Sequence, residues 1–82
     1  MAYEFWLSSE ASRSLLGSDD LVRRKMETAL RSLAAHPFVK SDFQERGPSG
    51  RVYEVICHGD VILTYWPDHA TKEVRVICCE IV

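Results

Sequence analysis

Two pairs of histidine and aspartate side chains are the residues in this sequence best able to do chemistry. His58 and Asp60 flank a glycine, and Asp68 and His69 are adjacent in the chain. Imidazole and carboxylate groups bind metals or exchange protons where they meet. A predicted strand separates the two pairs by roughly 15–20 Å, at about 3.3 Å per residue. We therefore predict that these four side chains are turn residues that form no metal site, and we predict no cofactor. The alternative is that Asp68 orients His69 as a base.

Three cysteines are the second group with chemical potential, and no two of them form a CxxC pair. This pattern is typical of reduced thiols in the cytoplasm rather than of a disulfide framework. Cys57 and Cys78 are predicted to be buried, where cysteine behaves as a small hydrophobic residue. Cys79 is predicted to point the other way, which makes it the more reactive thiol.

Basic residues gather in one segment of the first half of the chain, at Arg23, Arg24, Lys25 and Arg31. Most of them fall off the apolar stripe of a predicted helix, so a solvated surface is the first interpretation. The alternative is an electrostatic contact with an acidic partner segment or a phosphate backbone. The net charge of −2 argues against a general nucleic-acid coating protein.

The elements that must position these residues begin with a strand and two helices. Residues 2–7 alternate as a strand does, and Ser8 or Ser9 can cap the helix that follows. A second amphipathic helix starts at Asp19 or Asp20 and ends before Pro37. The short connection between the two helices predicts an antiparallel hairpin.

The second half of the chain changes to the period of strands. Residues 38–50 are predicted to be a polar connection, and residues 51–57, 61–66 and 73–77 to be strands rich in valine, isoleucine and aromatic residues. Gly59 starts a predicted two-residue turn between the first two of these strands. The whole chain, residues 1–82, is then one α+β domain of order βααβββ. A helical hairpin packs on one face of a mostly antiparallel four-stranded sheet.

Alternation along the strands predicts which residues face the helices. The predicted core face carries Tyr53, Val55, Cys57, Val61, Leu63, Tyr65, Val74, Val76 and Cys78. The opposite face carries an apolar set that we predict to bind a partner: Trp6, Ile56, Ile62, Trp66 and Ile77. Contiguous apolar patches on a small domain usually mark an interaction site.

Composition excludes several classes of protein. Apolar residues make up 46% of the 82 residues and charged residues 27%, which is ordinary globular usage rather than that of a disordered chain. No apolar run approaches the roughly 18–20 residues of a membrane span. Met1 to Leu7 contains Glu4 and no basic cluster, so we expect no signal peptide and no membrane association.

The order of elements resembles that of the RelE/ParE superfamily of toxins from bacterial toxin–antitoxin operons. The resemblance runs from "MAYEFWLS" to "VRVIC", with "LAAHP" closing the second helix and "GRVYEVICHGDVILTYW" forming a hairpin. It implies a RelE/ParE-like fold, an antitoxin partner that wraps and neutralises the toxin, and roles such as plasmid stabilisation. One branch of the superfamily cleaves mRNA in the ribosome, and another poisons DNA gyrase.

The residues of the nuclease branch do not carry over. Glu54 and Ile56 stand where that branch has alternating basic residues, and Ile62 stands where it has an arginine shortly before a tyrosine. The chain also stops at Val82, before the basic and aromatic segment that follows the last strand in that branch. Residues 51–82 contain more acidic than basic side chains, whereas RNA cleavage needs groups that stabilise negative charge.

The leading hypothesis is therefore a toxin-like protein that acts by binding protein and is neutralised by an antitoxin. A first alternative is a ribosome-dependent mRNA endonuclease, for which the nearest candidate residues are Arg51, His58, Lys72 and Arg75. A second is an inhibitor of DNA gyrase, which needs no hydrolytic residues. A third is a stand-alone or homodimeric domain with no toxic activity.

Overall fold

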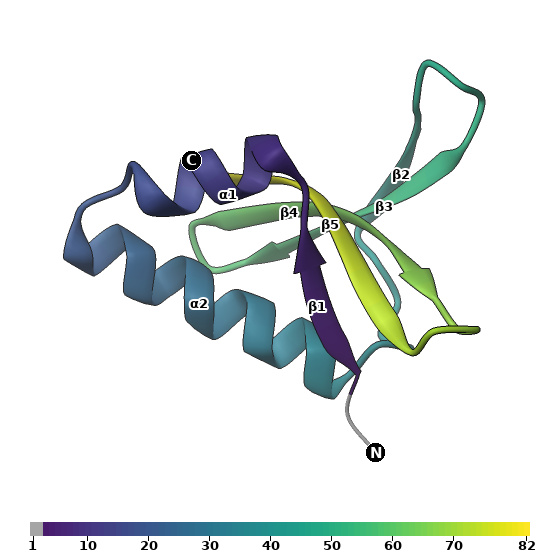
Figure 1. The fold of residues 1–82 in the computed structure, drawn as a ribbon, viewed down its shortest axis with the longest axis horizontal. Coiled ribbons are helices and arrows are strands. Elements are labelled where there is room, and N and C mark those ends of the chain that lie inside the picture. Colours follow the sequence, from purple (N-terminus) through teal and green to yellow (C-terminus); the bar gives the residue numbers. More distant parts are fainter. Residues whose placement is uncertain (1–2) are drawn as a thin grey trace.

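The computed structural model describes residues 3–82, in which two helices pack on one face of a twisted sheet (Figure 1). Ala2, with which the predicted first strand begins, lies outside the described residues. The elements in chain order are β1 (Glu4–Leu7), α1 (Ser9–Leu16), α2 (Asp20–Ala35), β2 (Phe43–Arg46), β3 (Val52–His58), β4 (Val61–Asp68) and β5 (Glu73–Ile81). No helix among these elements is long and apolar enough to cross a membrane.

Both helices begin where side-chain oxygens cap them. The hydroxyl of Ser8 accepts the amide N–H of Ala11 at 3.1 Å, and the carboxylate of Asp19 accepts that of Val22 at 2.9 Å. Each cap satisfies a backbone donor that the first helical turn leaves without a partner. The predicted helix starts at these serine and aspartate residues are confirmed.

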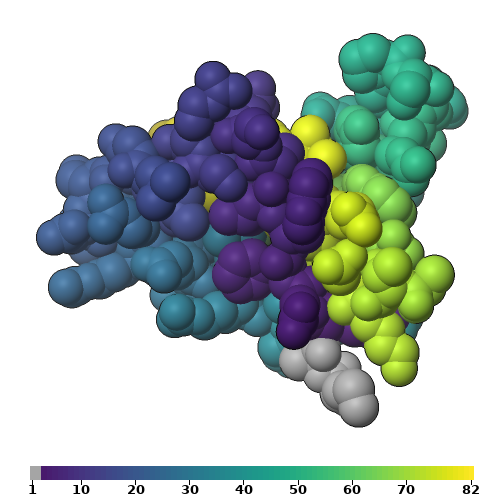
Figure 2. Space-filling model, in the orientation of Figure 1, coloured from purple at the N-terminus to yellow at the C-terminus, as the bar shows by residue number. Residues whose placement is uncertain are grey.

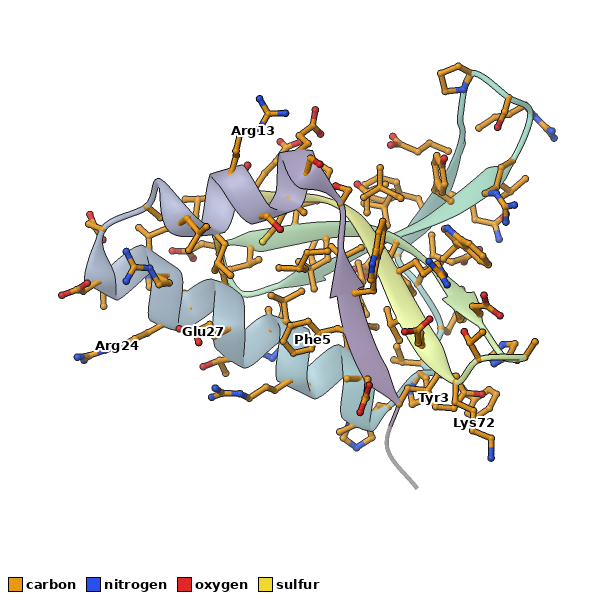
Figure 3. All side chains as sticks on the ribbon, viewed as in Figure 1. Tyr3, Phe5, Arg13, Arg24, Glu27 and Lys72 are labelled. Atoms are coloured by element: carbon orange, nitrogen blue, oxygen red, sulfur yellow. The ribbon has the colours of Figure 1, made fainter. Side chains whose placement is uncertain are left out.

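The core lies between the helices and strands β4 and β5. Its buried members are Ala11, Met26, Ala29, Leu30, Leu33, Val61, Leu63, Tyr65, Val74, Val76 and Cys79. Phe5 points from β1 toward α2 (Figure 3) but is 38% exposed, so it lies beside the core rather than in it. The apolar stripe of α2 thus meets the inward residues of the last two strands, as the sequence predicts.

The sheet differs from the predicted four-stranded antiparallel one. It has five strands in the order β1-β5-β4-β3-β2, and β1 runs parallel to β5. The extra strand β2 lies in the segment predicted to be a polar connection. All four of its residues are exposed, because β2 pairs only with β3 at the edge of the sheet, so no burial pattern marks it in the sequence. The β2–β3 hairpin projects past the helices (Figures 1 and 2).

The prediction of which side of β3 faces the helices is wrong. Ile56 pairs with Leu63 and packs against the core, whereas Val55 pairs with Thr64 on the other face. Cys57 pairs with Ile62 on that same outer face and is exposed. The reason is the two-residue turn, which makes His58 the partner of Val61 and fixes every later pair.

A β-bulge reverses the predicted orientations at the end of β5. Thr64 pairs with Cys78 and Tyr65 with Val76, so Ile77 has no partner of its own. An extra residue on one strand shifts the alternation by one position. Cys79 is therefore buried at 1% exposure, and Cys78 faces outward, the reverse of the prediction.

Candidate functional site

The sheet face turned away from the helices, which we call the open face, carries a stack of alternating aromatic and guanidinium groups. Strand register places Trp6 of β1, Arg75 of β5 and Trp66 of β4 side by side. The Arg75 guanidinium lies 5.2 Å from the Trp6 ring centroid and 5.6 Å from that of Trp66. Arg51, immediately before β3, continues the stack at 4.1 Å from the Trp66 ring. These distances are those of cation–π contacts.

Two carboxylates hold the guanidinium of Arg75 in this stack. Glu73 lies 2.9 Å from it and Asp68 lies 3.4 Å from it. Partial burial disfavours the ionised form of Asp68, but hydrogen bonds from Thr71, Ala70 and Arg75 outweigh burial and lower the pKa of Asp68 below its ordinary value. Two carboxylates therefore balance the charge of Arg75 and hold its side chain in place, so it is not a cation free to bind phosphate.

Exposed apolar side chains lie in the stack and beyond it on the open face. Trp6 is 45% exposed, and Phe43 of β2 is 53% exposed. Phe43 pairs with Val55, whose side chain is on the open face. Val55 is buried although no helix covers it. Sequence reasoning missed Phe43, and its only signal was an aromatic residue in an otherwise polar connection.

The predicted partner-binding residues divide between the two faces. Trp6, Ile62, Trp66 and Ile77 belong to the open face, with Ile77 at the bulge. Ile56 does not, because it pairs with Leu63 and packs against the core beneath the helices. The structure thus brings together four of the five residues of this patch.

The four predicted catalytic candidates do not form one site. Arg51 and Arg75 both contact Trp66 on the open face. His58 lies on the helix side of the sheet, where it lines a pocket beside α2. Lys72 lies in the β4–β5 turn with a left-handed backbone, φ 57°, and points away from the sheet (Figure 3).

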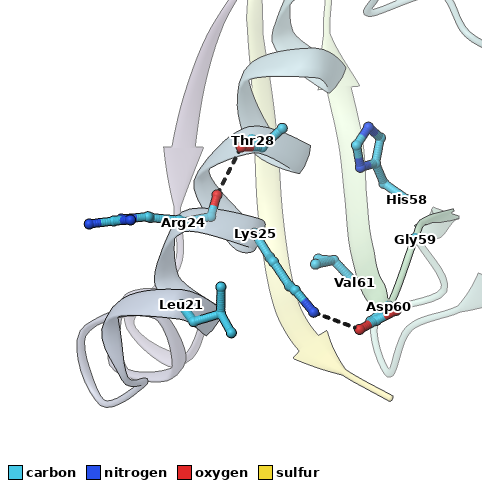
Figure 4. Close-up of a pocket in the computed structure, with 8 residues that line it drawn as sticks. All are labelled: Leu21, Arg24, Lys25, Thr28, His58, Gly59, Asp60 and Val61. Carbon is cyan, nitrogen blue, oxygen red and sulfur yellow. Dashed lines mark hydrogen bonds and ion pairs between the residues drawn. The ribbon is translucent and has the colours of Figure 1, made fainter.

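The pocket beside His58 lies between α2 and the β3–β4 turn (Figure 4). It has a volume of about 320 Å³, and Leu21 and Val61 contribute much of its apolar wall. Lys25 reaches across it to the carboxylate of Asp60 at 2.9 Å. The Lys25–Asp60 ion pair thus bridges the pocket, which Arg24 and His58 also line.

The two histidine–aspartate pairs also remain apart. The ring of His69 stacks on Phe38 with centroids 4.9 Å apart and an interplanar angle of 7°, and its Nδ1 lies 2.8 Å from the hydroxyl of Tyr3. Asp68 turns instead to Arg75. Within residues 3–82, no group of three His, Cys, Asp or Glu side chains is placed to hold a metal ion.

The cysteine thiols of β5 are held in their protonated form. Burial, with the nearby carboxylates of Glu80 and Glu10, raises the pKa of Cys78 to about 12. Burial and Glu80 raise that of Cys79 to about 11. The prediction that Cys79 is the reactive thiol is wrong, because a buried thiol with a raised pKa is a poor nucleophile.

Several solved structures share this architecture over nearly the whole chain. A chain of the toxin–antitoxin complex RelBE2 from Mycobacterium tuberculosis matches at a TM-score of 0.79, with 17% identity and all of both chains covered. The intact E. coli RelBE complex matches at 0.76, with 17% identity over 99% of this chain and 98% of that one. The RelE–RelB complex from Pyrococcus horikoshii matches at 0.71, with 13% identity over 99% and 96%.

The chain has the RelE toxin fold. The predicted RelE/ParE-like architecture is confirmed in its helical hairpin and sheet, and corrected in its strand number and in the parallel pairing of β1. No protein-family model matches the sequence, and no curated protein sequence is significantly similar to it. The likeness is therefore one of fold, at identities where functional residues need not be shared.

Proposed function

We propose that this chain is the toxin-type component of a toxin–antitoxin pair, located in the cytoplasm, and that it acts by binding protein through its open face. The solved structures of this fold include complexes of RelE with RelB, which supports an antitoxin-type partner here. The alternating stack of Trp6, Arg75 and Trp66 carries the proposal. It is a preformed aromatic surface of the kind where binding energy concentrates.

The same observation disfavours RNA cleavage. A phosphoryl transfer needs positive groups aimed at the developing charge. Arg75 is occupied by Asp68 and Glu73. Ile62, which stands where the resemblance implies an arginine, contributes an apolar side chain to the open face. An inhibitor of DNA gyrase or of another protein target requires only the binding surface.

The test begins with induced expression of the chain in a bacterial host, with growth as the readout and the neighbouring gene product present or absent. We expect growth arrest that the neighbouring product relieves. Transcript ends mapped during the arrest should show no cleavage in register with translated codons. Codon-periodic cleavage that is lost in Arg51→Ala or Arg75→Ala would overturn the protein-binding mechanism in favour of the endonuclease.

Binding is then measured by calorimetric titration of the purified chain with the neighbouring gene product. Trp66→Ala should weaken association by at least about 2 kcal/mol, as expected when a central aromatic anchor is removed. Arg24→Ala is the matched control, because Arg24 projects from α2 on the helix side (Figure 3). Equal affinities for the wild type and both variants, or a stable homodimer that binds no other protein, would contradict the proposal.

A further inference from the structure

The open face has a surplus of negative charge. By strand register and contact, its acidic side chains are Glu4, Glu45, Asp68, Glu73 and Glu80, and its basic ones are Arg51 and Arg75. Arg75 shares its single positive charge between two of these carboxylates. Glu4 lies beside Glu73 in the parallel β1–β5 pair, so the register places two acidic residues side by side on the open face.

The stack ends at the Trp6 ring, which a further cation can cover. Trp6 contacts Arg75 and is still 45% exposed, at the outer edge strand of the sheet. Glu4 precedes it by two residues and therefore lies on the same face. A guanidinium or ammonium group placed on the free part of the Trp6 ring would extend the alternation of aromatic and cation and would pair with Glu4.

The helix side of the molecule carries charges of both signs. Arg13 and Arg24 project outward from α1 and α2 (Figure 3), whereas Arg23 pairs with Asp20 and Arg31 with Glu27. The surplus of negative charge is therefore a property of the open face. Charge complementarity favours a cationic partner for that face.

We propose that the open face binds a cationic, amphipathic segment of a partner protein. One arginine or lysine of that segment covers Trp6 and pairs with Glu4. Its apolar residues cover Trp66, Ile77 and Phe43. The inference rests on the proposed function, in which the partner is a protein. It adds that the segment bound by the open face is cationic and amphipathic.

The test uses two synthetic amphipathic peptides of equal length, one built of leucine and arginine and the other of leucine and glutamate. Both tryptophans of the chain, Trp6 and Trp66, lie on the open face, so intrinsic fluorescence reports binding there directly. The arginine peptide should change the emission and bind, and the glutamate peptide should not. Glu4→Lys should weaken binding of the arginine peptide about tenfold. Glu27→Lys, the control on α2 with the same change in net charge, should leave it unchanged.

Equal binding of the two peptides, or equal loss in Glu4→Lys and Glu27→Lys, overturns the inference. Self-association in sedimentation that Glu4→Lys abolishes would make a second copy the occupant and also overturn it. If the neighbouring gene product binds through Trp66 with no dependence on Glu4, the inference fails and the proposed function stands. If the arginine peptide binds as expected but induction causes no growth arrest, the proposed function fails and the charge selectivity of the face stands.

Discussion

Replacing Arg75 by alanine should destabilise the fold, because the structure uses this guanidinium to hold the open face together. Its contacts with Trp6 and Trp66 are each worth about 0.5–1 kcal/mol at a partly exposed site, or roughly 1–2 kcal/mol for the two. The pair with Glu73, in which both side chains are 27% exposed, adds at most about 1 kcal/mol. The free energy of unfolding should therefore fall by roughly 1–3 kcal/mol.

Urea unfolding followed by circular dichroism and tryptophan fluorescence measures this change. At about 1 kcal/mol per molar urea, which is typical of a small domain, the midpoint should fall by roughly 1–3 M in Arg75→Ala. Arg51→Ala is the matched control, since Arg51 has one aromatic contact and is exposed, and it should cost less than about 1 kcal/mol. Arg75→Lys should fall between them, because lysine keeps the charge and loses the planar stacking.

An unchanged midpoint in Arg75→Ala would refute this reasoning. It would mean that the guanidinium contributes nothing to the folded state and is free for another task. The same conclusion would follow if Arg51→Ala were the more damaging of the two substitutions.

Two further predictions concern titratable groups. Cys57 should react first with an aromatic disulfide reagent, because it is exposed while burial raises the pKa of Cys78 and Cys79. A fast phase of the reaction that persists in Cys57→Ser would contradict this prediction. Stability should decline in acid as Asp68 is protonated: its lowered pKa gives a contribution that is complete above the unfolded-state value of about 3.9 and is lost as the pH falls through the folded-state value. Asp68→Asn should flatten that acid limb in a series of unfolding midpoints against pH, and an unchanged slope would count against the assignment.

The orientation of β3 could have been predicted from the sequence, because the turn that sets this orientation is itself predicted there. A two-residue turn at Gly59 and Asp60 requires His58 to face Val61, and Gly59 does adopt the positive φ of 61° that favours glycine. Counting outward from that pair places Ile56, rather than Val55, beside Leu63. Apolar alternation misled here because both faces of β3 are partly covered, so hydrophobicity alone does not identify the inner one.

Other features left no local signal. The bulge at Ile77 depends on how β4 and β5 pair, and nothing in the sequence of β5 distinguishes Cys78 from Cys79 as the inward residue. Strand β2 is exposed along its length, and its only partner is a strand that follows it in the chain. The parallel pairing of β1 with β5 joins residues about seventy positions apart, beyond the reach of local periodicity.

The sequence by itself determined the elements whose formation is local. The two capped helices, the buried stripe that includes Met26, Leu30 and Leu33, and the turn at Gly59 all follow from spacing and from backbone chemistry within a few residues. Tertiary structure alone decided the open face. Trp6, Arg75 and Trp66 come from three strands, and only the register of those strands makes one stack of them. Register is set by contacts distant in the chain, which is why the character of this face appears only in the folded molecule.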